Sequence, residues 1–263
     1  MQFNGAWHHK VLVYKVYENL MVPGTIKWVI EMAGVLLHLA MGDPEKTNPE
    51  NPAYNDSFKK AYTLGLLLPD IAKRELVRNE EEFEELFRGC SKEDILTYEE
   101  YLVYRKNNHF NPNKQKPSQQ DTRNPNLADF MNADYVDLQK AVWQGVFCHL
   151  VGDQTFYNEA HCIDFVRLSE DFQREVGVIE VWDEDRWSCS RTGKIYYNDY
   201  NLLNRCIEDE YEVLGRVRRI LSPPLIDKIL NGFKVRFPDS REEPVYMNLE
   251  NIRKCIDLVR RQI

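Results

Sequence analysis

The stretch Trp143–His161, WQGVFCHLVGDQTFYNEAH, determines how the rest of the chain is interpreted. Four residues in this stretch and directly before it are spaced by steps of four, three and four positions, which places them on one face of a helix. They are Val142, Val146, His149 and Asp153. The face begins with apolar residues, so we expect it to point toward the core and to carry an imidazole and a carboxylate inward. Because a buried charge without a partner is too costly to persist, a divalent metal ion such as zinc is the natural partner for both.

The composition is that of an ordinary globular protein. Hydrophobic residues make up 43% of the 263 positions and charged residues 29%, so the chain can bury a sizeable core. The formal net charge of −8 counts against general binding to nucleic acid or to an anionic membrane surface, which usually needs a basic excess. A local basic groove is still compatible with this balance.

The cysteine pattern and the start of the chain indicate a reduced, intracellular protein. The first residues, MQFNGAWHHKVLVYK, lack the charged and then apolar layout of a signal peptide. The cysteines are scattered and include no C-x-x-C pair, so we expect a cytoplasmic location. They are Cys90, Cys148, Cys162, Cys189, Cys206 and Cys255.

The most apolar early run, Val22–Met41, is interpreted as a core helix. It contains Lys27, Glu31 and His38. These side chains are too polar for a membrane-spanning helix, so no transmembrane segment is expected.

Apolar periodicity and capping residues predict a helical chain with weak strand signals. The fold class is therefore all-α, in a single domain over 1–263 with a metal-site core at about 24–165 and a C-terminal helical extension at about 166–263. Pro69 is expected to end the second helix, and Asn107–Asn126 is a long polar loop of a kind that is often functional. The stretch Asp164–Arg191 shows no clean period. The predicted helices are Gly24–Met41, Ser57–Leu67, Glu80–Phe87, Lys92–Lys106, Asp129–Val151, Asp199–Ile220 and Asn248–Ile263.

Single histidines and carboxylates carry little specificity by themselves. His38 lies among leucines, where a hydrogen-bonded core histidine is the simpler interpretation, and Asp70 would ordinarily cap the next turn. His109 opens a turn segment and would be an exposed loop residue. Each of them, however, lies at the end of an apolar helix or at the start of a polar loop. In a helical bundle such positions converge at one end.

Taken in order along the chain, these residues resemble the zinc-dependent phospholipase C family. The resemblance is carried by Gly65–Asp70 (GLLLPD), His109–Asn113 (HFNPN), His149–Asp153 (HLVGD) and His161. It spans His38–His161, a little under half of the chain. Related single-strand nucleases share the family's all-helical fold. The resemblance implies this fold here, with a metal site at one end of the bundle.

The resemblance also implies a role for each residue. Asp153 resembles a carboxylate that bridges to a neighbouring metal, which His38 would bind, and His161 resembles a ligand of a further metal. Two cations close together can activate a water molecule and hold both the attacking and the leaving oxygens of a phosphoester. Asp70 would orient that water or take its proton. Four residues are similar to the ligands of the family's best-formed zinc: Asp70, His109, His149 and Asp153.

Two departures from the family pattern bear on the number of metal ions. Secreted members use a freed N-terminal tryptophan as a ligand, whereas here Trp7 follows six other residues. A later His-x-x-x-Glu pair is also missing, because no histidine follows His161. The carboxylates that would replace it are Glu208, Asp209 and Glu212. We therefore expect one well-formed zinc site and two ions in total.

Three functions are compatible with this set of ligands. The leading hypothesis is a zinc-dependent phosphoester hydrolase of the phospholipase C type, which uses a metal-activated water and takes a phospholipid headgroup as a candidate substrate. The second is a single-strand nuclease or nucleotide phosphoesterase of the same fold, which would bind nucleic acid through Phe110 and nearby cations. The third is a non-catalytic protein with a structural zinc, since four protein ligands already close a first site. The cations near Phe110 are Lys106, Lys114, Lys116 and Arg123.

Overall fold

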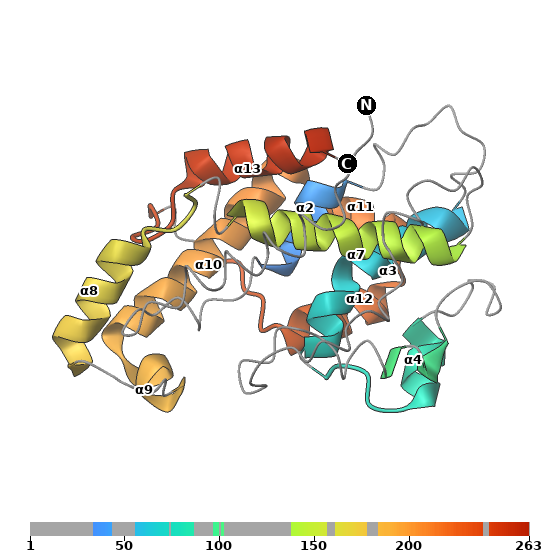
Figure 1. Ribbon diagram of the computed structural model, residues 1–263, viewed down its shortest axis with the longest axis horizontal. Coiled ribbons are helices and arrows are strands. Elements are labelled where there is room, and N and C mark those ends of the chain that lie inside the picture. The colour runs from blue at the N-terminus through green and yellow to red at the C-terminus, as the bar shows by residue number, and fades with distance from the viewer. Residues whose placement is uncertain are drawn as a thin grey trace, which may run out of the picture.

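The computed structural model describes residues 34–43, 56–73, 75–86, 97–99, 101–102, 138–156, 161–177, 184–238 and 242–262. Within these residues the regular structure is helical, and the β structure is limited to an isolated antiparallel bridge between Ile163 and Met247. The predicted all-α class is thus confirmed for this part of the chain (Figure 1). The helices are α2 (Val35–Gly42), α3 (Asp56–Lys73), α4 (Glu80–Leu86), α7 (Leu138–Gln154), α8 (Phe165–Val176), α9 (Glu184–Cys189), α10 (Arg191–Tyr211), α11 (Val213–Ile220), α12 (Pro223–Gly232) and α13 (Leu249–Gln262).

Helices α3 and α7 cross with their backbones in contact, and theirs is the most extensive contact between any two of these helices. A Cβ atom at Gly65 of α3 would lie 2.0 Å from the carbonyl oxygen of Val142. A Cβ atom at Gly145 of α7 would lie 2.2 Å from the carbonyl oxygen of Tyr62. Any side chain at either position would separate the helices, so the crossing depends on glycine in both.

The short helix α2 lies in the middle of the molecule. It packs against α3, α7, α10, α11 and α13 (Figure 1), and all of its residues are buried. A helix of 8 residues is too short to be stable alone, so its position depends on these neighbours.

Some of the C-terminal helices pack around α2, and others form a second part of the core. α8 and α9 pack on α10. There the indole ring of Trp187 is buried between Phe172 and Tyr196, with ring centroids 5.1 and 5.6 Å away. Among the described helices, none combines the length and the apolar character needed to cross a bilayer.

Helix α3 corrects the prediction that Pro69 ends the second helix. The helix continues through Pro69 to Lys73. Proline in a helix costs about 3 kcal/mol, because it removes a backbone donor and its ring crowds the preceding turn. Beyond it, however, Ile71 and Ala72 are 1% and 3% exposed. Burial of apolar side chains, at about 1.5–3 kcal/mol for a residue the size of isoleucine, offsets this cost.

The predicted helix Asp199–Ile220 is two helices in the structure. α10 already begins at Arg191, behind an N-cap in which the Ser190 hydroxyl accepts from the Gly193 N–H at 2.9 Å. It ends before Glu212, whose φ of 48° is left-handed. The carboxylate of Glu208 then accepts from the Leu214 N–H at 2.9 Å and caps the start of α11.

Two helices, α8 and α9, occupy the stretch Asp164–Arg191, for which the sequence showed no period. In α8 the Asp164 side chain caps the helix by accepting from the Arg167 N–H at 3.0 Å. The apolar residues of α8 that are fully buried, Leu168 and Phe172, form only a narrow inner face, so the apolar pattern in the sequence is weak. Helix α12, which starts with two prolines, was not predicted either.

The remaining helix predictions are confirmed where the structure describes them. α4 and α13 match their predicted ranges within one residue, and α7 covers the second half of Asp129–Val151 and extends beyond it. α2 matches the end of Gly24–Met41. Most of Lys92–Lys106 and the whole loop Asn107–Asn126 lie outside the described residues.

Replacing Gly145 by alanine tests the helix crossing. We expect Gly145→Ala to lower the free energy of unfolding by about 1–3 kcal/mol, the range for overpacked cores, because the new methyl group meets the α3 backbone. Gly215 of α11 is the matched control, since nothing lies within 4 Å of a Cβ atom there. Gly215→Ala should raise stability by up to about 1 kcal/mol through helix propensity. Urea unfolding of both variants measures the difference, and equal effects would contradict the crossing.

Candidate metal centre

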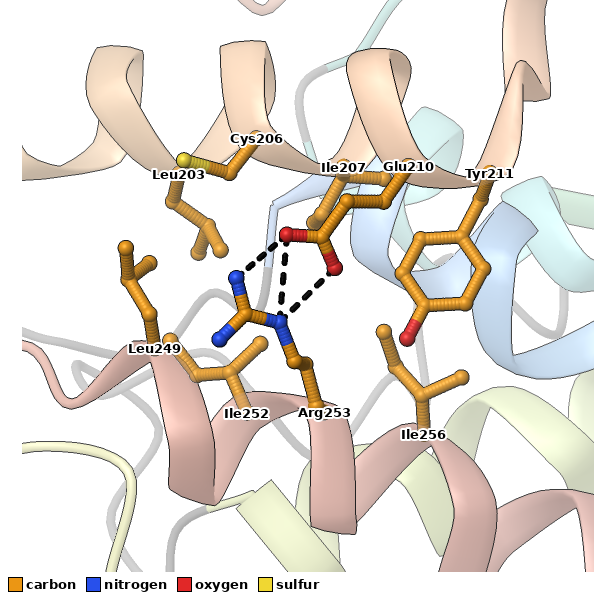
Figure 2. Close-up of a pocket in the computed structure, with 9 residues that line it drawn as sticks. All are labelled: Leu203, Cys206, Ile207, Glu210, Tyr211, Leu249, Ile252, Arg253 and Ile256. Carbon is orange, nitrogen blue, oxygen red and sulfur yellow. Dashed lines mark hydrogen bonds and ion pairs between the residues drawn. The ribbon is translucent and has the colours of Figure 1, made fainter. Parts of the chain in front are cut away.

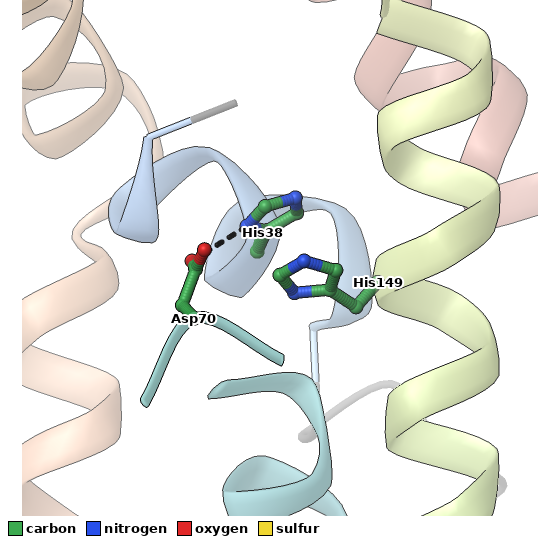
Figure 3. Close-up of side chains that lie close together, drawn as sticks. All are labelled: His38, Asp70 and His149. Carbon is green, nitrogen blue, oxygen red and sulfur yellow. Dashed lines mark hydrogen bonds and ion pairs between the residues drawn. The ribbon is translucent and has the colours of Figure 1, made fainter. Parts of the chain in front are cut away.

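Three helices bring two histidines and two aspartates together in the interior. His38 comes from α2, Asp70 from α3, and His149 and Asp153 from α7. Their residues are 1%, 4%, 2% and 8% exposed, respectively. One donor atom from each of His38, Asp70 and His149 lies within 4.8 Å of the other two. Figure 3 shows these three side chains gathered in one space between the helices.

The local sequence explains how α7 contributes two of these groups. His149 and Asp153 are one helical turn apart, on the same buried face as Val142 and Val146. Gly152 lets α2 approach, because a Cβ atom there would lie 2.7 Å from the Met41 sulfur. The inward face predicted from the spacing is therefore present, and a glycine beside it leaves room for the Met41 side chain of α2.

His38 connects the two carboxylates. Its Nδ1 lies 3.3 Å from Asp70 Oδ2, and its Nε2 lies 3.1 Å from Asp153 Oδ1. Its ring stacks on the ring of His149, with centroids 3.6 Å apart and an angle of 25° between the planes. Asp153 turns its other oxygen, Oδ2, toward His149 Nε2 at 3.4 Å. The four side chains thus form a continuous chain of contacts from Asp70 to His149.

A backbone carbonyl sets the tautomer of His149. Its Nδ1 lies 2.7 Å from the Leu66 carbonyl oxygen, which can only accept, so we assign the proton to Nδ1. In the neutral ring Nε2 is then an acceptor, and it faces an acceptor oxygen of Asp153. A cation between the two atoms would bond to both. Metal-binding histidines are usually held in this way, by a second hydrogen bond to a carbonyl or carboxylate.

The pKa values of His38 and Asp153 show that this centre attracts positive charge. Burial by itself lowers the pKa of the His38 imidazole, but the charges and hydrogen bonds of Asp153 and Asp70 outweigh it and raise the pKa to about 9. Burial by itself would raise the pKa of the Asp153 carboxyl, but the imidazoles of His149 and His38, when the nitrogen that faces it carries a proton, hold the pKa well below its ordinary value. Two nearly buried carboxylates require a cation, which either a proton on His38 or a metal ion can supply.

Pairs of these donor atoms are spaced as two ligands of one small divalent ion are. Bonds of about 2.0–2.2 Å in a tetrahedron place ligand atoms about 3.3–3.6 Å apart. The nitrogen–oxygen separations of 3.1, 3.3 and 3.4 Å are each close to this range, but His38 uses Nδ1 in one pair and Nε2 in another, so the three pairs do not form a single ligand shell. Imidazole nitrogen and carboxylate oxygen are also donors that zinc accepts.

The other residues singled out in the sequence do not join this group within the described part of the chain. His161 is exposed, has a φ of 48°, and its carbonyl accepts from Asn251 at 3.1 Å. Glu208 caps α11, and Asp209 pairs with Arg205 at 3.0 Å. Glu212 forms the left-handed junction between α10 and α11 and is not part of the group either.

His109, Trp7 and the basic residues of the polar loop lie outside the described residues. Asp70, which was expected in isolation to cap a turn, lies inside α3 and contacts His38. Sequence reasoning missed the Leu66 carbonyl that holds His149, because a backbone group leaves no pattern in the sequence. Pro69 gives no signal for this contact either, because the N–H that it lacks would have donated to the carbonyl of Gly65, four residues earlier, and not to that of Leu66.

A hollow lies away from this centre, between α10 and α13 (Figure 2). Its lining is largely aliphatic, and its charged groups are already paired, because Arg253 Nε donates to Glu210 Oε2 at 2.8 Å. Since this ion pair spans the hollow and satisfies its charges, we do not interpret it as a functional site.

No family model matches the chain, and neither curated proteins nor solved structures show a significant match. The assignment of the centre therefore depends on its own residues.

The raised pKa of His38 predicts how the stability of the metal-free protein varies with pH. Protonated His38 stabilises the fold fully below about pH 6.5, its unfolded pKa, and this contribution is lost as the pH rises through about 9. The free energy of unfolding should therefore fall between pH 6.5 and 9, by at most about 1.4 kcal/mol per pH unit. His38→Gln should remove this dependence. The free energy of unfolding of the wild type and of His38→Gln is measured after chelation across this pH range. Parallel pH profiles of the two proteins would contradict the role of His38.

Proposed function

We propose that the protein is a metal-dependent phosphoester hydrolase of the phospholipase C type, with zinc held by His38, Asp70, His149 and Asp153. The observation that carries this proposal is the convergence of two buried imidazoles and two buried carboxylates from three helices, with one donor atom of three of them within 4.8 Å of each other. The buried carboxylates create a demand for positive charge, and the donor types are those that zinc prefers.

The position of Asp153 supports two ions rather than one. It directs Oδ1 toward His38 and Oδ2 toward His149, at 3.1 and 3.4 Å. A carboxylate that bridges two ions uses its oxygens separately in this way.

The residues of the chain then have distinct tasks in hydrolysis. When bound, the metal lowers the pKa of a water molecule and polarises a phosphoryl oxygen. Asp153 and the two imidazoles would hold the cations in place, while the Leu66 carbonyl keeps Nε2 of His149 directed inward. Asp70 is the residue positioned to orient the water and take its proton, since its carboxylate lies beside the donor atoms of both histidines.

Chelation and metal add-back test the proposal. The purified protein should contain zinc, and it should hydrolyse an aryl phosphodiester or a phosphocholine ester. A chelator should abolish this activity, and added Zn²⁺ should restore it. Cleavage of single-stranded nucleic acid alone would assign the protein to the nucleases of this fold instead. Absence of metal-dependent turnover over the whole panel would remove the hydrolase proposal, and unfolding on chelation would assign the zinc a structural role.

Substitution of single histidines tests which of them bind the metal. His149→Ala should reduce the zinc content and leave the helix content unchanged. It should lower the activity by more than about 100-fold, because the loss of a metal ligand lowers activity more than the loss of a residue that only hydrogen-bonds to a ligand. His161→Ala is the matched control at an exposed position and should retain the zinc bound between His149 and Asp153. Circular dichroism, metal analysis and initial rates give the comparison. Full zinc content and activity in His149→Ala would contradict the ligand assignment.

A further inference from the structure

Two arginines from the C-terminal part of the chain hold the end of α2. Arg260 of α13 donates from Nε and Nη2 to the carbonyl oxygen of Ala40, at 2.9 and 2.6 Å. The same guanidinium lies 3.3 Å from Asp43 Oδ2. Arg216 of α11 reaches the other oxygen of Asp43, at 2.8 Å. A single carboxylate at the end of α2 thus joins two helices that come more than 170 residues later in the chain.

These contacts satisfy groups that the helix itself leaves open. The last carbonyls of a helix have no donor within it, and a cation at this end also interacts favourably with the helix dipole. Arg260 supplies the donor for Ala40, and the hydroxyl of Tyr62 supplies one for Gly42 at 3.1 Å. Asp43, which caps the helix with a left-handed φ of 30°, is only 2% exposed. A carboxylate this deeply buried needs paired cations, and the two arginines supply them.

The end of α2 is coupled closely to the orientation of His38. Ala40 lies two residues after His38, in a helix of only 8 residues. His38 must direct one ring nitrogen at Asp70 and the other at Asp153 at the same time. Such sites tolerate displacements of about 0.5 Å or rotations of about 10–20°. A small rotation of α2 about its axis would therefore break at least one of the two contacts.

We propose that Arg260 is a positioning residue of the metal centre. It binds Ala40 and Asp43 together, fixes the rotation of α2 and thereby holds His38 toward both carboxylates. The C-terminal helices would then be part of the metal-binding unit. This inference rests on the proposed function, since it assumes that a metal ion binds at His38.

The chain provides a matched control for this role. Arg253 lies on the same helix, α13, and pairs with Glu210 of α10 through Nε, at 2.8 and 3.1 Å (Figure 2). Both arginines connect α13 to another element through an ion pair. Arg253, however, contacts α10, whereas Arg260 lies over the Tyr211 ring of α10, 5.2 Å from its centroid, and also contacts α2. Removing either arginine would lower the stability of the protein, but only the removal of Arg260 would change the position of α2, which carries His38.

The experiment compares Arg260→Met with Arg253→Met in the full chain. Both replacements keep a long aliphatic stem and remove the guanidinium. The metal-free proteins are titrated with Co²⁺ and with Zn²⁺, the Co²⁺ absorption bands report the ligand geometry, and urea unfolding gives the stability of each variant. We expect Arg260→Met to weaken Co²⁺ binding by about 10–100-fold, as for other partners outside the ligand shell, and to shift the bands. Arg253→Met should bind Co²⁺ like the wild type, with unchanged bands.

A milder variant covers the case in which Arg260→Met does not fold. Arg260→Lys keeps the charge but lacks the planar fork that contacts Ala40 and Asp43 together, so it should weaken Co²⁺ binding by several-fold. The positioning role is wrong if every folded Arg260 variant binds Co²⁺ with wild-type affinity and bands. A wild-type protein that binds neither ion would instead overturn the proposed function, so the two failures are distinguishable.

Discussion

The structure depends on the close crossing of α3 and α7. Two glycines, Gly65 and Gly145, remove the side chains that would keep these helices apart, and each backbone lies against the other. At this separation Leu66, the residue after Gly65, can offer its carbonyl to His149. One further turn along α3 places Asp70 beside the same space. The crossing thus determines that carboxylate and imidazole, 79 positions apart in the sequence, lie in one centre.

The centre combines this crossing with a strong local need for positive charge. Asp70 and Asp153 are both nearly buried, and His38 lies between them with a raised pKa. Such an arrangement is costly unless a proton or a metal ion compensates the carboxylates. The same principle operates at the other end of α2, where Asp43 is buried between Arg216 and Arg260. A short helix is thus held at its C-terminal end by one charged cluster and directs its histidine into another.

The sequence predicted the helices best where apolar residues recur regularly at helical spacing. The face of α7 that carries His149 and Asp153 was evident from spacing alone, as was the amphipathic helix α13. Prediction failed where local rules and tertiary packing disagreed. Pro69 does not end α3, because the residues after it are buried against the rest of the core. The predicted helix Asp199–Ile220 is interrupted at Glu212, and Glu208 caps the helix that follows. The spacing of apolar residues does not indicate such a break.

The sequence by itself predicted the all-α class and the inward face of α7, and it placed His38, Asp70, His149 and Asp153 among six candidate metal ligands. These follow from spacing and from side-chain chemistry, which act over one or two helical turns. Only the tertiary structure decided that His38, Asp70, His149 and Asp153 meet, that Leu66 orients His149, and that Arg260 holds the helix carrying His38. Contacts between residues this far apart in the chain depend on how helices cross. That geometry is determined by close packing and by buried charge, neither of which leaves a periodic pattern in the sequence.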